Sequence, residues 1–145
     1  MDIRSLMPSF LRTLIPYESP NEGAPEGTVW LNTNEYPTAT KYEMRFETLN
    51  RYPQVQPDLF RTRYAQYAGV GPEEVLVTRG ADEGIELIIR TFCTPFKGTV
   101  LSALPTYSMY GISAKSCGAT VLAIDATRSL ALGTLGLCTA LAQNQ

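Results

Sequence analysis

Short apolar runs alternate with helix-like segments between residues 75 and 124, and this alternation constrains the fold more than any other feature of the sequence. Three runs have the length and β-branched character of buried strands: residues 75–78, 99–102 and 120–124. Between the first two, apolar residues recur at the spacing of one helical face: Ile85, Ile88, Ile89 and Phe92. Residues 107–116 have similar spacing. Because strand–helix–strand units build parallel sheets, we expect an α/β fold with a mostly parallel, helix-covered sheet.

Upstream of these units, the sequence predicts an arm and two further helices. Prolines and glycines interrupt residues 1–27 too often for a helix or strand to persist, so we expect an irregular arm that packs on something else. The spacing of Tyr42, Phe46 and Leu49 predicts one amphipathic helix. The spacing of Phe60, Tyr64 and Tyr67 predicts a second, with Pro57 in its first turn and Gly69 as its C-terminal stop.

The sequence contains no histidine, which removes serine–histidine and cysteine–histidine catalysis and every histidine-ligated metal site. Its three cysteines, Cys93, Cys117 and Cys138, are too far apart for a paired metal or redox motif, so we expect no metal and a reducing, cytoplasmic setting. The net charge of -2 gives no reason to expect nucleic acid or an anionic membrane surface. No apolar run is long enough for a membrane span or a signal peptide.

Two junctions between an expected strand and the helix after it are candidate ligand-binding positions. Gly80, Ala81 and Asp82 occupy the first, where the unpaired N–H groups of a helix N-terminus suit a phosphate. Tyr107 follows the next strand, and ligands of open parallel sheets bind outside the carboxyl ends of the strands. Its ring could stack on a planar ligand. A purely structural alternative remains, in which Gly80 permits a turn, Asp82 caps a helix and Tyr107 covers the core.

Four separate blocks of sequence then carry a resemblance to a known family: residues 30–37 (WLNTNEYP), 50–53 (NRYP), 79–87 (RGADEGIEL) and 105–110 (PTYSMY). In order and spacing they resemble the histidinol-phosphate aminotransferases, a family of class-II pyridoxal-phosphate-dependent enzymes, from about Leu14 to Asp125. The resemblance implies the aspartate-aminotransferase-like fold, also called pyridoxal-phosphate fold type I. It implies a cytoplasmic homodimer that uses pyridoxal 5'-phosphate in histidine biosynthesis. The amino group would pass between the small molecules histidinol phosphate and 2-oxoglutarate.

The resemblance also implies roles for individual residues. By match to the family's motifs, the backbone N–H groups of Ala81 and Asp82 would bind the cofactor phosphate, and Tyr107 would stack on the pyridine ring. Tyr52 would reach the cofactor phosphate of the neighbouring subunit. Three residues are implied on the substrate side: Tyr17, Asn34 and Glu35.

The groups that this chemistry needs further along the family's sequence are missing from these 145 residues. Pyridoxal-phosphate enzymes use a lysine for the Schiff base and an acidic group at the pyridinium nitrogen. Lys41 and Lys115 lie in helix-like segments and Lys97 in a loop, so none matches the family's serine–lysine turn and no catalytic residue is assigned. We therefore expect the arm and the first part of the large domain, incomplete and inactive alone.

Composition changes abruptly near residue 126. Residues 126–145 contain one charged residue, Arg128, whereas the preceding part of the chain contains all the others. We expect an arm over 1–27, a partial cofactor-binding domain over 28–125 and a divergent tail over 126–145, explained by a frameshift or early stop or, alternatively, as a terminal helix over 130–142. Two other readings of the whole chain stay open: a small doubly wound phosphate- or nucleotide-binding module, and a non-functional remnant. Substrate choice between histidinol phosphate and aromatic amino acids also stays open.

Overall fold

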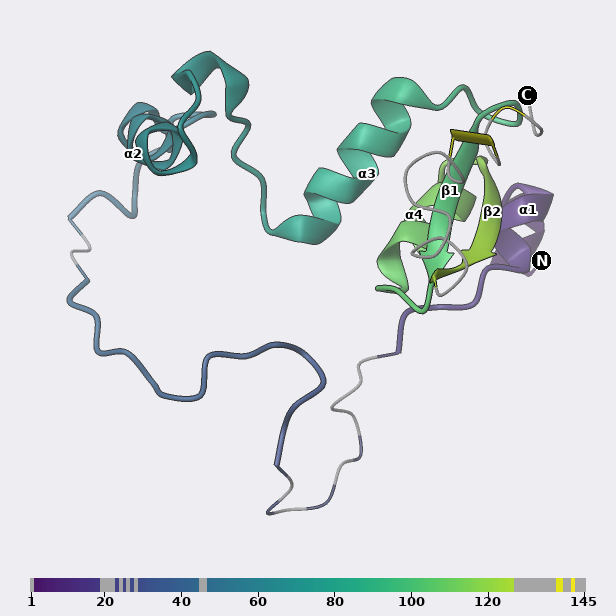
Figure 1. The fold of residues 1–145 in the computed structure, drawn as a ribbon, viewed down its shortest axis with the longest axis horizontal. Helices are drawn as coiled ribbons and strands as arrows, with labels where there is room; N and C mark the ends of the chain where they lie inside the picture. The colour runs from purple at the N-terminus through teal and green to yellow at the C-terminus, as the bar shows by residue number, and fades with distance from the viewer. Residues whose placement is uncertain are drawn as a thin grey trace. The chain divides into compact units, whose positions relative to one another are not determined.

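The computed structural model describes residues 2–18, 23, 25, 27, 29–44, 47–126, 138, 139 and 142. The chain divides into two compact units, the first formed by Met1–Tyr17 with Arg79–Gln145 and the second by Glu18–Thr78. Each unit is described by itself (Figure 1). The expected tail over 126–145 and the alternative helix over 130–142 fall almost entirely outside the described residues.

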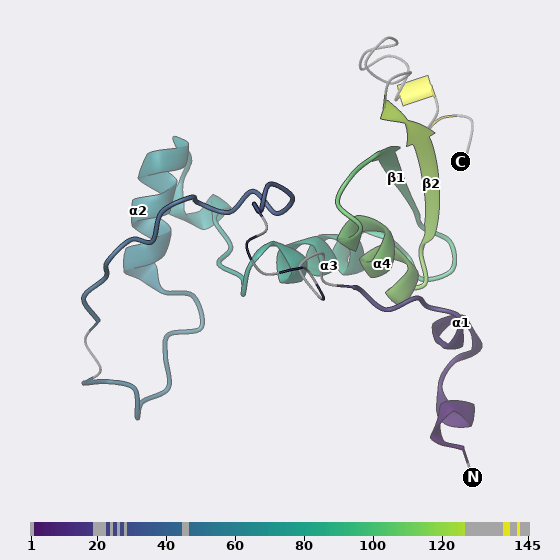
Figure 2. The ribbon, with the colours of Figure 1, turned by 90° about the horizontal axis from the view of Figure 1, so that it is seen from below.

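A strand–helix–strand unit forms the centre of the first unit. Strands β1 (Thr99–Leu104) and β2 (Thr120–Asp125) pair in parallel, with Thr99 opposite Thr120. Helix α4 (Met109–Ser116) connects them and packs on both strands and on α3 (Ala81–Phe92) (Figures 1 and 2). The prediction of parallel strands joined by a helix is therefore confirmed for residues 99–125, where the described part of the sheet has two strands.

The core of this unit is small and lies between α3, α4 and the sheet. Its buried residues are Ile89, Ala114 and Ala119, against which Ile85, Cys93, Val100, Cys117 and Val121 pack. The helix predicted between residues 85 and 92 is confirmed, but only part of its predicted apolar face is covered. Ile88 and Phe92 are 62% and 81% exposed, because α4 and the strands cover only the side of α3 that carries Ile85 and Ile89.

The arm is more regular than its prolines predict. Within its described residues it forms a 3-10 helix, η1 (Ile3–Leu6), and one turn of α-helix, α1 (Ser9–Arg12). Asp2 caps η1 by accepting a hydrogen bond from the N–H of Arg4 at 2.9 Å, and Pro8 directly precedes α1, a position that proline tolerates. The expectation of a fully irregular arm was wrong for residues 3–12.

In the second unit, α2 (Asp58–Ala68) ends at Gly69, which has the left-handed conformation, as predicted. Pro57 is the N-cap residue of this helix and does not lie in its first turn. A 3-10 turn, η2 (Pro72–Glu74), follows. The helix predicted from Tyr42, Phe46 and Leu49 is not formed in the described residues there, since 41–44 are irregular and 47–50 form a turn. Phe46 lies outside the described residues. Tyr42 and Leu49 are exposed, and so short an amphipathic helix needs a surface to pack on.

The strand predicted over residues 75–78 is also absent, although the backbone of Val75 is extended. Side chains, and not a neighbouring strand, bind both backbone groups of Val77 and the carbonyl oxygen of Val75. The Gln56 amide accepts from the N–H of Val77 at 2.8 Å and donates to its carbonyl oxygen at 2.9 Å. Arg61 donates to the carbonyl oxygens of Val75 and Pro72 at 3.2 and 2.7 Å. A β-strand requires a ladder with a second strand, which the apolar run alone does not supply.

Candidate functional site

The N-terminus of α3 presents backbone N–H groups at the start of a twelve-residue helix. Gly80 is its N-cap residue, with φ +93° and ψ -179°, a conformation that is essentially restricted to glycine. The N–H groups of Ala81, Asp82 and Glu83 have no acceptor within the helix, and Gly80, which has no side chain, cannot cap them itself. Such an end attracts anions through these N–H groups and through the helix dipole.

Arg79 and Glu83 fix the chain just before this helix. The Arg79 guanidinium donates to the Glu83 carboxylate at 3.1 and 2.9 Å, and the Arg79 N–H donates to the same carboxylate. These hydrogen bonds lower the pKa of Glu83 and raise that of Arg79. Arg90 pairs with Glu86 at 3.3 Å further along the helix. Because both arginines have carboxylate partners, an anion at this end of α3 depends on the backbone N–H groups.

Tyr107, in the loop after β1, makes a hydrogen bond to the first turn of α3. Its hydroxyl donates to Asp82 Oδ1 at 3.0 Å, and this hydrogen bond is the main reason that the pKa of Tyr107 rises to about 12. The Tyr17 ring lies edge-on to it, with ring centroids 6.4 Å apart and an angle of 75°. Tyr110 makes a similar contact at 6.2 Å and 88°. The structure thus brings together three residues predicted from different segments: Tyr17, Asp82 and Tyr107.

The ionisation of Tyr107 gives a direct test of its contact with Asp82. At about pH 11, a phenol of pKa about 12 is roughly one-tenth ionised, whereas one with the ordinary value of about 10 is roughly nine-tenths ionised. The phenolate absorbance of the native protein minus that of Tyr107→Phe should therefore be small at that pH. The contact is complete below pH 10 and is lost as the pH rises through 12, because only the protonated hydroxyl donates.

Asp82→Asn supplies the control for this titration. It removes the negative charge that opposes ionisation of Tyr107, so the pKa of the phenol should fall towards its ordinary value. A Tyr107 phenol that ionises near pH 10 in the native protein would contradict the described contact.

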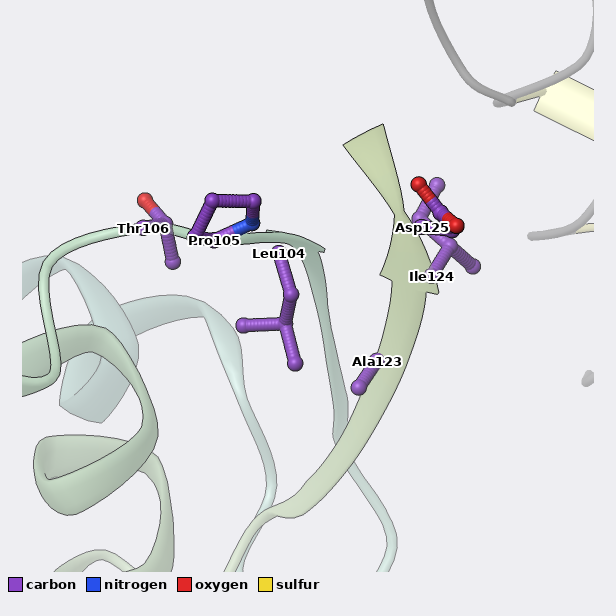
Figure 3. A pocket seen from close by; sticks show the side chains of 6 residues that line it. All are labelled: Leu104, Pro105, Thr106, Ala123, Ile124 and Asp125. Atoms are coloured by element: carbon purple, nitrogen blue, oxygen red, sulfur yellow. The ribbon is translucent and has the colours of Figure 1, made fainter. Parts of the chain in front are cut away.

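A hollow of about 680 Å³ lies at the carboxyl ends of the two strands (Figure 3). Its lining residues are Leu104, Pro105 and Thr106 after β1, and Ala123, Ile124 and Asp125 at the end of β2. This edge of a parallel sheet is where ligands of such folds bind. The sequence analysis did not select the end of β2, where Asp125 is the ionisable residue. The expectation that ligands bind at the carboxyl ends of parallel strands would have selected it, because residues 120–124 were predicted as a strand. The i, i+4 spacing of Arg79 and Glu83 likewise indicates their pairing.

The remaining predicted site residues belong to the second unit. Tyr52 is fully exposed, and Asn34 and Glu35 are exposed in a turn where Asn34 has φ +57°, a value that asparagine tolerates. The structure does not join these three residues to Asp82 and Tyr107 in one unit.

The lysines of the first unit lie away from the strand-end hollow. Lys97 precedes β1, and Lys115 lies in the last turn of α4, which leads into β2. Both are therefore at the amino ends of the parallel strands. Over the residues with a described position, no group of three acidic, cysteine or histidine side chains could hold a metal ion, and no helix is long and apolar enough to cross a membrane.

Comparison with known proteins identifies the class. The family model described as aminotransferase class I and II matches residues 26–145, so the chain belongs to this family. The match extends through residues 126–145, whose composition led us to expect no resemblance.

Curated relatives specify the resemblance further, and each is called a histidinol-phosphate aminotransferase. The protein from Cronobacter sakazakii is 51% identical over 88% of this chain and 35% of its own length. The Shigella boydii protein is 56% identical over 74% of this chain and 30% of its own length. The Salmonella paratyphi A protein is 46% identical over 94% of this chain and 38% of its own length. The resemblance stated from the four sequence blocks is confirmed. The chain spans about a third of the length of these relatives.

Proposed function

We propose that this chain supplies the N-terminal arm and the first part of the cofactor-binding domain of a histidinol-phosphate aminotransferase. The observation that carries the proposal is the N-terminus of α3, with Gly80 at its N-cap, next to the Tyr107 ring. The names of relatives at 46–56% identity support the substrate. The enzyme would move an amino group between histidinol phosphate and 2-oxoglutarate.

The residues of the first unit fit pyridoxal 5'-phosphate. Ala81 and Asp82 offer two backbone N–H groups to a phosphate, and no side chain blocks the position that a Cβ of Gly80 would take. The Tyr107 ring offers a face for the pyridine, held by the hydrogen bond to Asp82. When bound, the cofactor supplies an electron sink for the transfer of the amino group. This chain's residues would bind the phosphate, orient the ring and keep the Tyr107 hydroxyl protonated.

The second unit and the arm would contribute the other contacts. Tyr52, whose side chain is fully exposed, is available to reach the cofactor phosphate in a second subunit of a homodimer. Tyr17, Asn34 and Glu35 would lie on the substrate side. A cytoplasmic setting is consistent with the three free cysteines.

The 145-residue polypeptide by itself should not catalyse transamination. Its lysines in the first unit lie at the amino ends of the strands, away from Asp82 and Tyr107. We expect no glutamate-dependent turnover and no lysine adduct trapped by borohydride at a stoichiometric site. Turnover together with a single trapped lysine would contradict the assignment of an incomplete site.

Ligand titration separates this function from a nucleotide-binding module. Pyridoxine 5'-phosphate is the suitable probe, because it has no aldehyde to condense with Lys41, Lys97 or Lys115. Measured by calorimetry, it should bind more tightly than unphosphorylated pyridoxine, and flavin mononucleotide and adenosine monophosphate should show no comparable heat. Tighter binding of either nucleotide would favour the doubly wound binding module.

A further inference from the structure

The arm contacts the first unit at two separate places, and the first is an aromatic pair. Phe10 in α1 is half-buried, and its ring meets the Phe96 ring edge-on at 5.2 Å and 87°. Helix α1 also packs on α4. The arm is therefore attached to its own chain near its beginning.

The backbone of Phe96, whose side chain is 71% exposed, is fixed by a hydrogen bond where the ring meets Phe10. Phe96 has φ +62°, and its N–H donates to the carbonyl oxygen of Gly118 at 2.8 Å. A Cβ on Gly118 would lie 3.3 Å from the Phe96 ring, so the glycine allows that ring to lie close to the backbone. Phe96 precedes β1 and Gly118 precedes β2, which places this contact at the amino ends of the strands.

The second contact lies at the opposite end of the strands. Tyr17 meets Tyr107, which follows the carboxyl end of β1. Helix α1 contacts α4, and Figure 2 shows the chain leaving α1 and passing α4. The segment from Phe10 to Tyr17 thus extends along the length of the strand–helix–strand unit.

The segment from Phe10 to Tyr17 is only just long enough to span the length of β1. β1 has six residues, which at about 3.3 Å each span about 20 Å. From Phe10 to Arg12 the helix advances about 3 Å, and the five steps to Tyr17 reach at most about 17 Å when extended. The Arg12 guanidinium also donates to the carbonyl oxygens of Met7 and Ser5 at 3.0 and 2.8 Å, which stiffens the attached end.

We propose that Phe10 is a positioning residue, whose contact with Phe96 holds the arm so that Tyr17 covers Tyr107 of the same chain. A ligand bound beside Tyr107 would then be enclosed by its own subunit's arm. That use of Tyr17 rests on the proposed function, but the ring contact itself does not, and it is tested without any ligand.

The experiment follows the Tyr17–Tyr107 contact by nuclear Overhauser effects between the two rings in the full chain. Phe10→Ala should abolish these signals while the amide resonances of β1 and β2 stay in place. Phe10→Tyr, which keeps the aromatic edge, should restore them. Trypsin cleavage after Arg12 should accelerate roughly 2- to 13-fold in Phe10→Ala, as expected for loss of one aromatic pair.

Leu6→Ala is the matched control, because Leu6 is a largely exposed apolar side chain in the same arm. It should leave both the ring signals and the cleavage rate unchanged. Ring signals that persist in Phe10→Ala, or that disappear equally in Leu6→Ala, would overturn the proposal. If Phe10→Ala shifts the β1 and β2 amides, Phe10→Leu is judged by the same signals, since it retains apolar contact without a ring.

Discussion

Replacement of Gly80 by alanine is expected to lower the free energy of unfolding by about 1–3 kcal/mol, the usual cost of holding a non-glycine residue in a sparsely populated backbone conformation. Gly80 has φ +93° and ψ -179°, and no atom outside residues 79–81 lies within 4 Å of the position that a Cβ would take. The cost is therefore conformational and not steric. Urea unfolding and binding of pyridoxine 5'-phosphate provide the two measurements, and the phosphate affinity should fall at least tenfold as the N-terminus of α3 distorts.

Gly111→Ala is the matched control for this substitution. Gly111 lies inside α4 with no positive φ, and a Cβ there would meet no atom within 4 Å. Alanine should therefore stabilise the protein by about 0.5–1 kcal/mol, through helix propensity and a less flexible unfolded chain. Equal destabilisation by both substitutions would show that the special conformation of Gly80 is not the cause.

Gln56→Ala is expected to release residues 75–78 from the rest of the second unit. The Gln56 amide makes two hydrogen bonds to the backbone of Val77, and removing it leaves a partly buried N–H and carbonyl without their partner. Such a loss costs about 1–3 kcal/mol. Hydrogen exchange of the Val77 amide should accelerate by one to two orders of magnitude, since about 1.4 kcal/mol corresponds to a factor of ten.

Gln54→Ala tests whether this effect is specific. Gln54 is the same residue type two positions earlier, but it is exposed, and its hydrogen bonds to Asp58 are long, at 3.4 and 3.5 Å. The exchange of Val77 should be unchanged in this variant. Similar acceleration in both variants would mean that Gln56 does not hold the segment.

Local signals predicted most of the regular structure. Helix α2 begins directly after Pro57 and ends at Gly69, and both positions suit the backbone preferences of these residues. Helix α4 forms between two parallel strands, as the alternation of strand and helix predicts. The run at 75–78 failed because pairing is not a local property: Val77 bonds to Gln56, and no apolar pattern contains that information. Ile88 and Phe92 are exposed for a related reason, since periodicity does not state how much of a helix face its neighbours cover.

In the candidate site, too, some residues could be selected from sequence, whereas the contacts between them could not. Gly80, Asp82 and Tyr107 were selected from sequence because both junctions were expected to follow strands of one parallel sheet. That reasoning holds for Tyr107, which follows β1, whereas residues 75–78 before α3 form no strand and Asp82 is joined to Tyr107 by a hydrogen bond. The hydrogen bond between Tyr107 and Asp82 and the contact of Phe10 with Phe96 join residues far apart in the chain. Neither has a signal in spacing or composition, so only the three-dimensional arrangement reveals them.

The proposed function requires that the N-terminus of α3 bind a phosphate whose attached ring lies beside Tyr107. Titration of the isotopically labelled chain with pyridoxine 5'-phosphate, followed by amide and ring resonances, tests it most directly. We predict saturable shifts of the Ala81 and Asp82 amides and of the Tyr107 ring, with no such amide shifts for unphosphorylated pyridoxine. Absence of these shifts, or shifts centred elsewhere in the chain, would rule out this mode of binding.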